Sequence, residues 1–394
     1  GTPSSEILET ISKYRHDGVY IEWSVNEKAA MEVAAAAAYS GARAMVTMKQ
    51  VGLNVAADPL MSLAYVGVKG GMVIVSADDP GPISSQTEQD TRRFADFCRI
   101  PVFDPSSPEE AYKMIGEAFE YSEKYNTPVL FRPTTRVCHA YASIDNCDSP
   151  SPKKYEGFVK DSKKWVIFPR LSFANHIMIE KRNVEIGKDF STYSANKAEG
   201  GNSEKVVVTS GISYAYTKEC LKDYPDVKLI KIATAYPFPE DFVLSSLEGA
   251  KEVLCIEELS PFIEEQILKL AGKHGLQLKV SGKLDRKVQA GGENSTDKIA
   301  AILGDFLGKD FTAEGYDLSD APALPVRPPV LCAGCPHRAS FYAVKQAMKG
   351  RKAYFCGDIG CYTLGNAMPL DMVDTCLCMG AGITMAQGFN HTDS

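Results

Sequence analysis

The sequence predicts an α/β protein that contains several doubly wound parallel sheets. Apolar runs of strand length alternate with helical patterns of about ten to fifteen residues, which is typical of parallel sheets covered by helices. The chain has 394 residues, of which 44% are hydrophobic and 24% charged. A chain of this length is expected to form two or three domains, each with its own core.

The first domain is expected to comprise residues 1–150. We predict helices at 4–14 and 27–39, and strands at 19–25, 42–48, 71–77, 102–104 and 128–133. A further helix should begin at Ser107, because a capping serine precedes a proline and two acidic residues there. Ligands of doubly wound sheets bind at the carboxyl ends of the strands, so the loops that follow the strands are the expected site.

Composition divides the remaining chain into four segments. Residues 151–204 lose the alternating pattern, which predicts a linker with some helix. Residues 205–310 predict a second α/β domain, with strands at 206–209, 228–232, 253–256 and 278–280. Residues 311–329 form a proline-rich connector, and 330–394 open a third α/β segment with a strand at 353–356. We expect both ends of the sequence to lie inside domains.

Composition also excludes several classes of protein. The net charge is −7 and the basic residues are scattered, so no electrostatic footprint for nucleic acid is present. No apolar run reaches the length of a membrane span, and no export signal opens the chain. Eleven cysteines is an odd number, which argues against a disulfide framework. A reducing cytoplasm is the expected compartment.

Three cysteines near the C-terminus indicate redox chemistry. Cys332 and Cys335 form a Cys-x-x-Cys pair ahead of a predicted helix, and Cys361 follows the predicted strand 353–356. Thiolates held close together suit a soft metal or an iron–sulfur cluster. A zinc ribbon or a set of buried thiols are the alternatives. The helix that begins at Pro336 favours an anionic ligand such as a diphosphate at its N-terminus.

Two loops of the first domain carry further candidates. Glu27 opens a helix rich in small residues directly after a predicted strand, where simple capping is the alternative to catalysis. Lys49, Gln50 and Asn54 follow the strand that ends at residue 48, which is where a substrate loop belongs. The alternative for these three residues is a solvated turn.

Two adjacent arginines follow a long polar loop at residues 78–90. Arg92 or Arg93 could hold a carboxylate through two hydrogen bonds, although adjacent arginines on a helix usually face solvent. Glu257 and Glu258 follow the predicted strand 253–256, and we expect them to be surface charges.

Motifs along the whole chain resemble the alpha subunits of the indolepyruvate:ferredoxin oxidoreductases. These belong to the thiamine-diphosphate-dependent 2-oxoacid:ferredoxin oxidoreductases. The matching motifs occur in order at residues 1–6, 22–27, 49–54, 85–92, 132–136, 332–338 and 357–365. The resemblance implies a thiamine-diphosphate-binding fold: a pyrimidine-binding domain without its first βα unit, a transketolase-C-terminal-like domain and the start of a diphosphate-binding domain.

The resemblance also implies roles for individual residues. Glu27 matches the glutamate that binds the cofactor's aminopyrimidine and promotes formation of its ylide. Substrate contacts are expected from Thr2, Lys49, Gln50, Asn54 and either Arg92 or Arg93. The remaining cofactor-binding positions are expected at His337, Gly357, Asp358, Gly360, Gly380 and Gly382. Cys332, Cys335 and Cys361 match cluster-ligand positions of related oxidoreductases.

The implied enzyme oxidatively decarboxylates aryl 2-oxoacids to acyl-coenzyme A and CO₂. Its cofactors are thiamine diphosphate, Mg²⁺ and [4Fe–4S] clusters, and the Mg²⁺ loop and the cluster domain are expected beyond residue 394. Its partners are a beta subunit, ferredoxin and coenzyme A, in a hetero-oligomer with two alpha subunits. A non-oxidative thiamine-diphosphate decarboxylase or transferase, and a metal-stabilised scaffold without activity, are the alternative functions.

Overall fold

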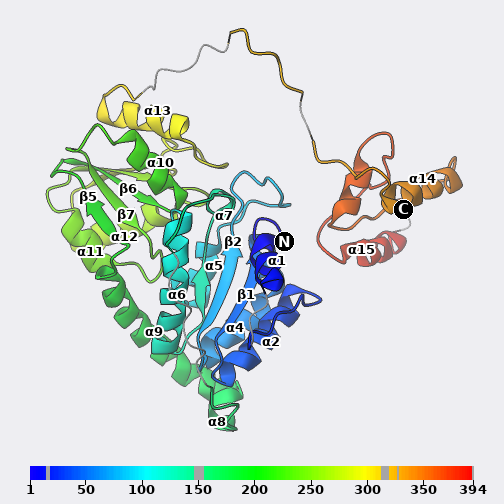
Figure 1. Cartoon of the computed structure of the whole chain (residues 1–394), viewed down its shortest axis with the longest axis horizontal. Helices are drawn as coiled ribbons and strands as arrows, with labels where there is room; N and C mark the ends of the chain where they lie inside the picture. The colour runs from blue at the N-terminus through cyan, green and yellow to red at the C-terminus, as the bar shows by residue number, and fades with distance from the viewer. Residues whose placement is uncertain (15–17, 146–154, 312–318, 326–327, 393–394) are drawn as a thin grey trace. The chain divides into compact units, whose positions relative to one another are not determined.

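The structure is a computed structural model that describes residues 1–14, 18–145, 155–311, 319–325 and 328–392. The chain forms two compact units, residues 1–314 and 315–394. Residues 1–314 contain two sheets covered by helices (Figure 1). Within the described ranges, no helix is both long and apolar enough to cross a membrane. The predicted α/β class with parallel sheets is confirmed.

The first sheet has four parallel strands in the order β1-β2-β4-β3. Its strands are β1 (Ala44–Lys49), β2 (Met72–Ala77), β3 (Val102–Phe103) and β4 (Val129–Phe131). Its helices are α1 (Ser5–Lys13), α2 (Glu27–Tyr39), α3 (Gln50–Val55), α4 (Ala57–Val66), α5 (Thr91–Cys98), α6 (Pro108–Tyr125) and α7 (Thr135–Cys138). Every residue of β2 is buried, as expected for a parallel strand between two helical layers.

Side chains alternate between the two faces of this sheet. Met72 and Ile74 pack with residues of α2 and α4, whereas Val73 and Val75 pack with residues of α6. The start of α6 is as predicted, because the Ser107 hydroxyl accepts a hydrogen bond from the Glu110 amide at 3.2 Å.

The predicted strand at 19–25 is wrong. Residues 18–26 have no strand hydrogen bonds among the described residues, and Val25 is 91% exposed. An apolar run without a neighbouring strand cannot form a ladder, so β-propensity alone does not make it a strand.

Residues 155–199 form more structure than a linker. They contain α8 (Ser162–Trp165), α9 (Pro169–Ser191) and β5 (Lys197–Glu199). α9 packs on α4 and α11 and buries Ile179, Ile186 and Phe190. Part of the predicted linker, residues 151–154, lies outside the described residues.

The second sheet has the order β5-β7-β6-β8-β9, and only β5 is antiparallel to its neighbour. Its other strands are β6 (Lys205–Ser210), β7 (Lys228–Ile232), β8 (Glu252–Ile256) and β9 (Lys279–Ser281). Its helices are α10 (Ile212–Cys220), α11 (Glu240–Ser246), α12 (Phe262–His274) and α13 (Thr296–Leu307). The four predicted strands of this domain are therefore present.

Main-chain hydrogen bonds connect the two sheets directly. The Val102 amide donates to the Tyr236 carbonyl at 2.7 Å, and the Asp104 amide donates to the Ala233 carbonyl at 2.8 Å. One cluster of buried apolar residues also extends through both sheets. The two sheets therefore share a continuous core.

The second unit contains α14 (Pro336–Ala347), the 3₁₀ helix η1 (Cys361–Asn366) and α15 (Ala381–Asn390). The predicted helix behind Cys335 is α14. The predicted strand 353–356 is reduced to one parallel bridge between Cys356 and Thr375 in the described part of the unit. The connector 311–329 is described only in part.

Candidate functional site

Glu27 lies at the N-terminus of α2 and packs against the backbone of α3. Asn26 caps the helix, because its side chain accepts a hydrogen bond from the Ala29 amide at 2.8 Å. Glu27 is half-buried, and a Cβ built on Gly52 would lie 2.7 Å from its Oε1 atom. The carboxylate can therefore occupy this position only because residue 52 has no side chain.

Lys49 ends β1 in the same region as Glu27. Burial lowers the pKa of the Lys49 ammonium, and the carboxylates of Asp79 and Glu27 oppose this effect electrostatically. A carboxylate and a cation thus share one electrostatic environment at the carboxyl edge of the first sheet. This is the edge at which doubly wound sheets bind ligands.

Thr2, Lys49 and Gln50 are brought together by the loop at residues 79–90. The Lys49 ammonium donates to the Ser84 carbonyl at 2.9 Å, and the Gln50 amide donates to the Thr87 carbonyl at 3.1 Å. The Ser84 hydroxyl donates to the Thr2 carbonyl at 3.2 Å. Three predicted substrate-contact residues therefore meet one loop, which argues against a simple solvated turn for Lys49 and Gln50.

Gln50 and Asn54 have different environments although both belong to α3. Gln50 is fully buried, and its Oε1 atom has no hydrogen-bond partner in the described part of the chain. Asn54 is exposed near the end of the helix. Gln50 is thus a buried side chain with one unused acceptor beside the loop.

Arg92 is buried between the two sheets and has no accessible surface. Its guanidinium donates to Asp90 at 2.7 Å, to Glu257 at 2.9 Å and to the Glu258 carbonyl at 2.9 Å. Further donations reach the Ser210 hydroxyl and the Ser260 carbonyl. Arg92 therefore has no donor left for a substrate in this structure; it connects the loop before α5 to the strand ends of the second sheet.

Arg93 also meets an acidic residue of helix α12, which belongs to the second α/β domain. Its guanidinium forms two hydrogen bonds with Glu265, at 2.5 and 2.7 Å, and lies 5.2 Å from the centre of the Phe262 ring. About a third of the side chain is exposed. Neither arginine is therefore a free surface charge. Arg92 binds the loop before α12, and Arg93 binds α12 itself.

A buried ionic network around Arg132 was not predicted from the sequence. Arg132 follows β4 and donates to Asp78, which follows β2, at 2.7 Å. It also donates to Asp104, which follows β3, at 3.2 Å. Burial raises the pKa of Asp78 to about 6, against the opposing charge of Arg132. One feature of the sequence could have predicted this network: a charged residue directly follows each of the apolar strands β2, β3 and β4.

The expectation that Glu257 and Glu258 are surface charges is wrong. Their residues are 1% and 5% exposed. Glu257 accepts hydrogen bonds from the amides of Ile263 and Glu264 as well as from Arg92. Burial raises the pKa of Glu258 to about 7, although its carboxylate accepts a hydrogen bond from the Asn294 amide. These strand ends face the first sheet rather than solvent.

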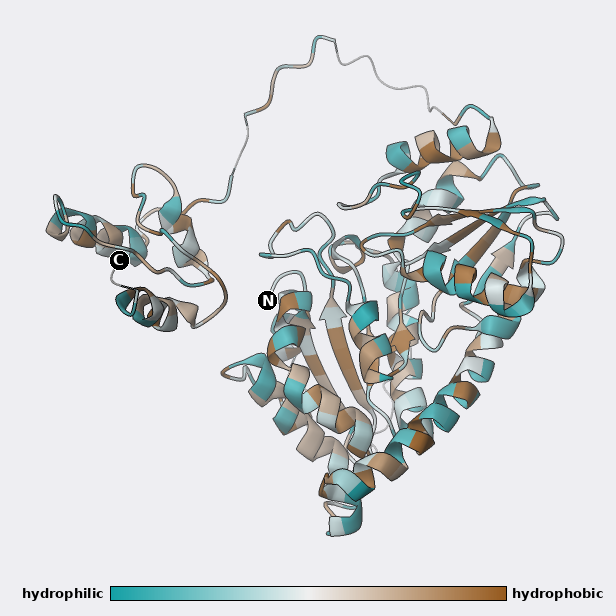
Figure 2. Cartoon of the chain, turned by 180° about the vertical axis from the view of Figure 1, so that it is seen from behind, coloured by the Kyte–Doolittle hydropathy of each residue, from teal (hydrophilic) through white to brown (hydrophobic). Residues whose placement is uncertain are grey.

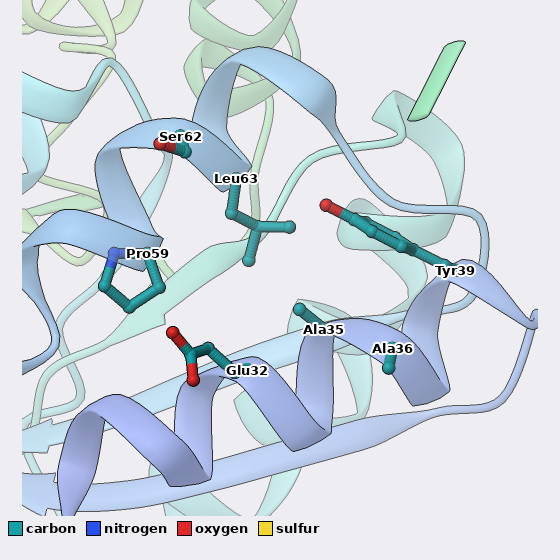
Figure 3. A pocket seen from close by; sticks show the side chains of 7 residues that line it. All are labelled: Glu32, Ala35, Ala36, Tyr39, Pro59, Ser62 and Leu63. Carbon is teal, nitrogen blue, oxygen red and sulfur yellow. The ribbon is translucent and has the colours of Figure 1, made fainter. Parts of the chain in front are cut away.

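A separate cavity of about 250 Å³ lies between α2 and α4 (Figure 3). Its lining is mostly small or apolar, and its acidic residue, Glu32, pairs with Lys28 at 2.7 Å. The residues that line it are Glu32, Ala35, Ala36, Tyr39, Pro59, Ser62 and Leu63. Glu27 and Lys49 do not line this cavity, so it is distinct from the candidate site.

The second unit brings most of its predicted glycine and aspartate positions together. The Asp358 carboxylate accepts hydrogen bonds from the Gly380 amide at 2.7 and 2.8 Å, at the start of α15. A Cβ built on Gly382 would lie 2.8 Å from the Cys356 carbonyl oxygen and 3.0 Å from that of Gly357. Gly360 N donates to the Thr363 hydroxyl in the same turn. A carboxylate thus occupies the electropositive N-terminus of α15.

The cysteines of this unit do not converge. Cys332 and Cys335 lie in one turn, and the Cys335 sulfur lies 3.4 Å from Nδ1 of His337. The His337 ring packs edge-on against Tyr362, with ring centres 5.5 Å apart. Among the described residues, which include Cys361, no three His, Cys, Asp or Glu side chains form a group that could hold a metal. Cys332, Cys335 and Cys361 therefore form no three-ligand group among the described residues, and their assignment as cluster ligands stays a prediction.

Comparisons with known proteins find similarity to oxidoreductases that act on 2-oxoacids. Residues 2–189 match the family model "Pyruvate flavodoxin/ferredoxin oxidoreductase, thiamine diP-bdg". "Indolepyruvate oxidoreductase subunit IorA" of Thermococcus kodakarensis is 41% identical over 99% of this chain and 62% of its own length. The protein of the same description from Methanothermobacter marburgensis is 39% identical over 100% of this chain and 65% of its own length.

More distant matches support the same fold. A 2-oxoglutarate:ferredoxin oxidoreductase from Magnetococcus marinus has a TM-score of 0.58 at 15% identity, and the match covers 78% of this chain and 60% of that one. The chain spans less than two thirds of the length of the IorA proteins it matches. The resemblance that the sequence motifs predicted is confirmed: the chain is similar over nearly its whole length to the indolepyruvate oxidoreductase subunits IorA, and residues 2–189 match the thiamine-diphosphate-binding model of the pyruvate flavodoxin/ferredoxin oxidoreductases.

Proposed function

We propose that this chain is part of the alpha subunit of an oxidoreductase that decarboxylates aryl 2-oxoacids such as indolepyruvate. The products are acyl-coenzyme A and CO₂, and the electrons pass through iron–sulfur clusters to ferredoxin. The names of the IorA relatives support the aryl substrate. Cys332, Cys335 and Cys361 remain candidate ligands of one of these clusters in this proposal.

The observation that carries the proposal is the position of Glu27 against Gly52 at the carboxyl edge of the first sheet. Glu27 is a half-buried carboxylate at a helix start, and Gly52 beside it has no side chain. Such a carboxylate is suited to bind a basic nitrogen of a flat heterocycle. Bound thiamine diphosphate would supply a carbon nucleophile for the keto group and an electron sink for decarboxylation. Glu27 would hold a proton at N1′ of its aminopyrimidine ring.

The other residues of this edge would bind and orient the substrate. Lys49 is a partly buried cation beside Glu27, which suits attraction of the 2-oxoacid carboxylate. Gln50 holds the loop at residues 79–90 through Thr87, and this loop in turn contacts Thr2. Arg92 is left out of this role because all of its hydrogen bonds are made within the protein.

Glu27→Gln in the complete enzyme tests the proposal. Glutamine keeps the shape of the side chain but cannot share a proton with N1′, so kcat should fall by about two orders of magnitude or more. Glu32→Gln, on the exposed face of the same helix, is the control and should leave kcat unchanged. Cofactor affinity, measured by titration calorimetry with Mg²⁺, gives a second readout. A normal kcat for Glu27→Gln would leave this residue as an acidic group of the first helical turn and defeat the proposal.

Metal analysis separates the proposed enzyme from its alternatives. Iron with acid-labile sulfide in the complete complex supports electron transfer through clusters. A complex that decarboxylates without iron is a non-oxidative thiamine-diphosphate enzyme, and one zinc per chain without activity is a scaffold.

A further inference from the structure

Arg182 of α9 is a buried cation that forms no ion pair with any residue that the structure describes. The residue is 9% exposed, and within the described part of the chain its Nε and Nη2 atoms have no hydrogen-bond partner. Burial lowers the pKa of this guanidinium to about 10. A buried, unpaired guanidinium is strongly unfavourable unless an anion is supplied.

The acidic residues of α9 are engaged with other cations. Glu180 pairs with Arg99 at 2.8 Å, and Glu185 pairs with Lys188 at 3.1 Å. Asp189 accepts hydrogen bonds from Lys124 and Tyr125. None of these three acids compensates Arg182, and the described residues give its Nε and Nη2 atoms no other partner.

Arg182 lines an open cleft of about 590 Å³ on the surface of α6 and α9. The cleft is predominantly positive, because three of its residues are cations and one is acidic. Apolar and aromatic groups complete the wall. The other lining residues are Lys124, Tyr125, Met178, Lys181, Val184 and Glu185. The cleft therefore suits a carboxylate that is flanked by apolar groups.

An exposed apolar stripe runs along α9 beside this cleft. Phe173 is 71% exposed, and Ile177 and Val184 on the same face are 45% and 59% exposed. Figure 2 shows apolar patches along this long helix on the outside of the unit. From residue 173 to residue 184 the stripe is about 16 Å long. A surface of this length exceeds what a small ligand in the cleft would cover, and exposed apolar patches mark protein interfaces.

We propose that α9 binds a second, different protein chain that places a carboxylate against Arg182. Apolar side chains of that chain would cover Phe173, Ile177 and Val184. A symmetric contact with a second copy is disfavoured, because Glu180, Glu185 and Asp189 are already paired within the chain.

The test measures how tightly the complete subunit binds the second subunit of the oxidoreductase. The inference rests on the proposed function in one respect: the second subunit of that oxidoreductase is used as the binding partner. Arg182→Met should raise the dissociation constant by about 30-fold or more, the scale for a lost buried ion pair at an interface. Phe173→Ser combined with Ile177→Ser should also weaken binding. Arg286→Met, at an exposed arginine of the second sheet's loops, is the control and should bind normally.

The thermal unfolding midpoint of the unbound subunit should not fall in the Arg182→Met variant, although its binding weakens. Arg182→Met removes an unpaired buried charge, so the midpoint should stay unchanged or rise while binding weakens. A lower midpoint would reveal a partner for Arg182 within the subunit and overturn the inference. Binding within threefold of the wild type, or loss of self-association alone, would also overturn it.

The proposed function can fail independently of this inference. Oxidation of 2-oxoacids is measured separately on the same complex. An inactive complex whose assembly depends on Arg182 would refute the function and retain the docking surface.

Discussion

Arg92 and Glu257 form a fully buried ion pair, 2.9 Å long, between the two sheets. Asp90 completes the arrangement at 2.7 Å from the same guanidinium. Residues from the carboxyl ends of both sheets thus meet in a layer without solvent. Charges in such a layer stabilise the fold only while each has its partner.

Replacing Arg92 should therefore destabilise the contact between the sheets. Arg92→Met leaves Glu257 buried without its cation and Asp90 with the more distant Arg132, 4.0 Å away, which should lower the free energy of unfolding by about 3–5 kcal/mol. Thermal unfolding of the full chain measures this change. Arg93→Met is the matched control, because its pair with Glu265 is partly exposed and should contribute about 1 kcal/mol or less. Equal effects of the two variants would contradict the structural role of Arg92.

Glu258 should make stability fall as the pH rises. Burial raises the pKa of its carboxyl from 4.5 to about 7, so the folded state holds a proton that the unfolded state has released in this interval. The contribution is complete below pH 4.5 and is lost by about pH 7, with a total of about 3 kcal/mol. Thermal midpoints across this range should decline less in Glu258→Gln than in the wild type. Parallel pH profiles would show that Glu258 ionises normally.

Gly52 should control the position of Glu27. A methyl group at residue 52 would lie 2.7 Å from Oε1 of Glu27, so Gly52→Ala must displace the carboxylate. We expect kcat of the complete enzyme to fall by about 10- to 100-fold. Gly116→Ala is the matched control, since a Cβ at this helical glycine meets no atom within 4 Å. Unchanged turnover by Gly52→Ala would separate Glu27 from the chemistry.

Asp358 should stabilise the first turn of α15. Asp358→Ala removes the carboxylate that accepts from the Gly380 amide, which should cost about 1 kcal/mol locally. Hydrogen exchange of the amides at residues 380–384 in the full chain should become about fivefold faster. Asp371→Ala, at an exposed aspartate of the same unit, should leave these amides unchanged.

The sequence predicts local structure better than it predicts which strand ends face each other. Glu27 was placed correctly at the start of a helix, because the cap and the alanine-rich run are local signals. The burial of Glu258 depends on Arg92 and on the first sheet, far away in sequence, so no local pattern could reveal it. The predicted strand that ends at Val25 was wrong, because a strand forms only beside a neighbouring strand, and the local sequence does not specify that neighbour. Arg182 was missed because a helical pattern does not show whether a charge has a partner.

The hydrogen bonds from Val102 to Tyr236 and from Asp104 to Ala233 have a mechanical consequence. They join β3, an edge strand of the first sheet, to the residues that follow β7 of the second sheet. The ion pairs of Arg92 add further bonds between the two sheets. Hinge bending between the sheets would have to break main-chain bonds and expose buried charges together. The two sheets should therefore move as one rigid block.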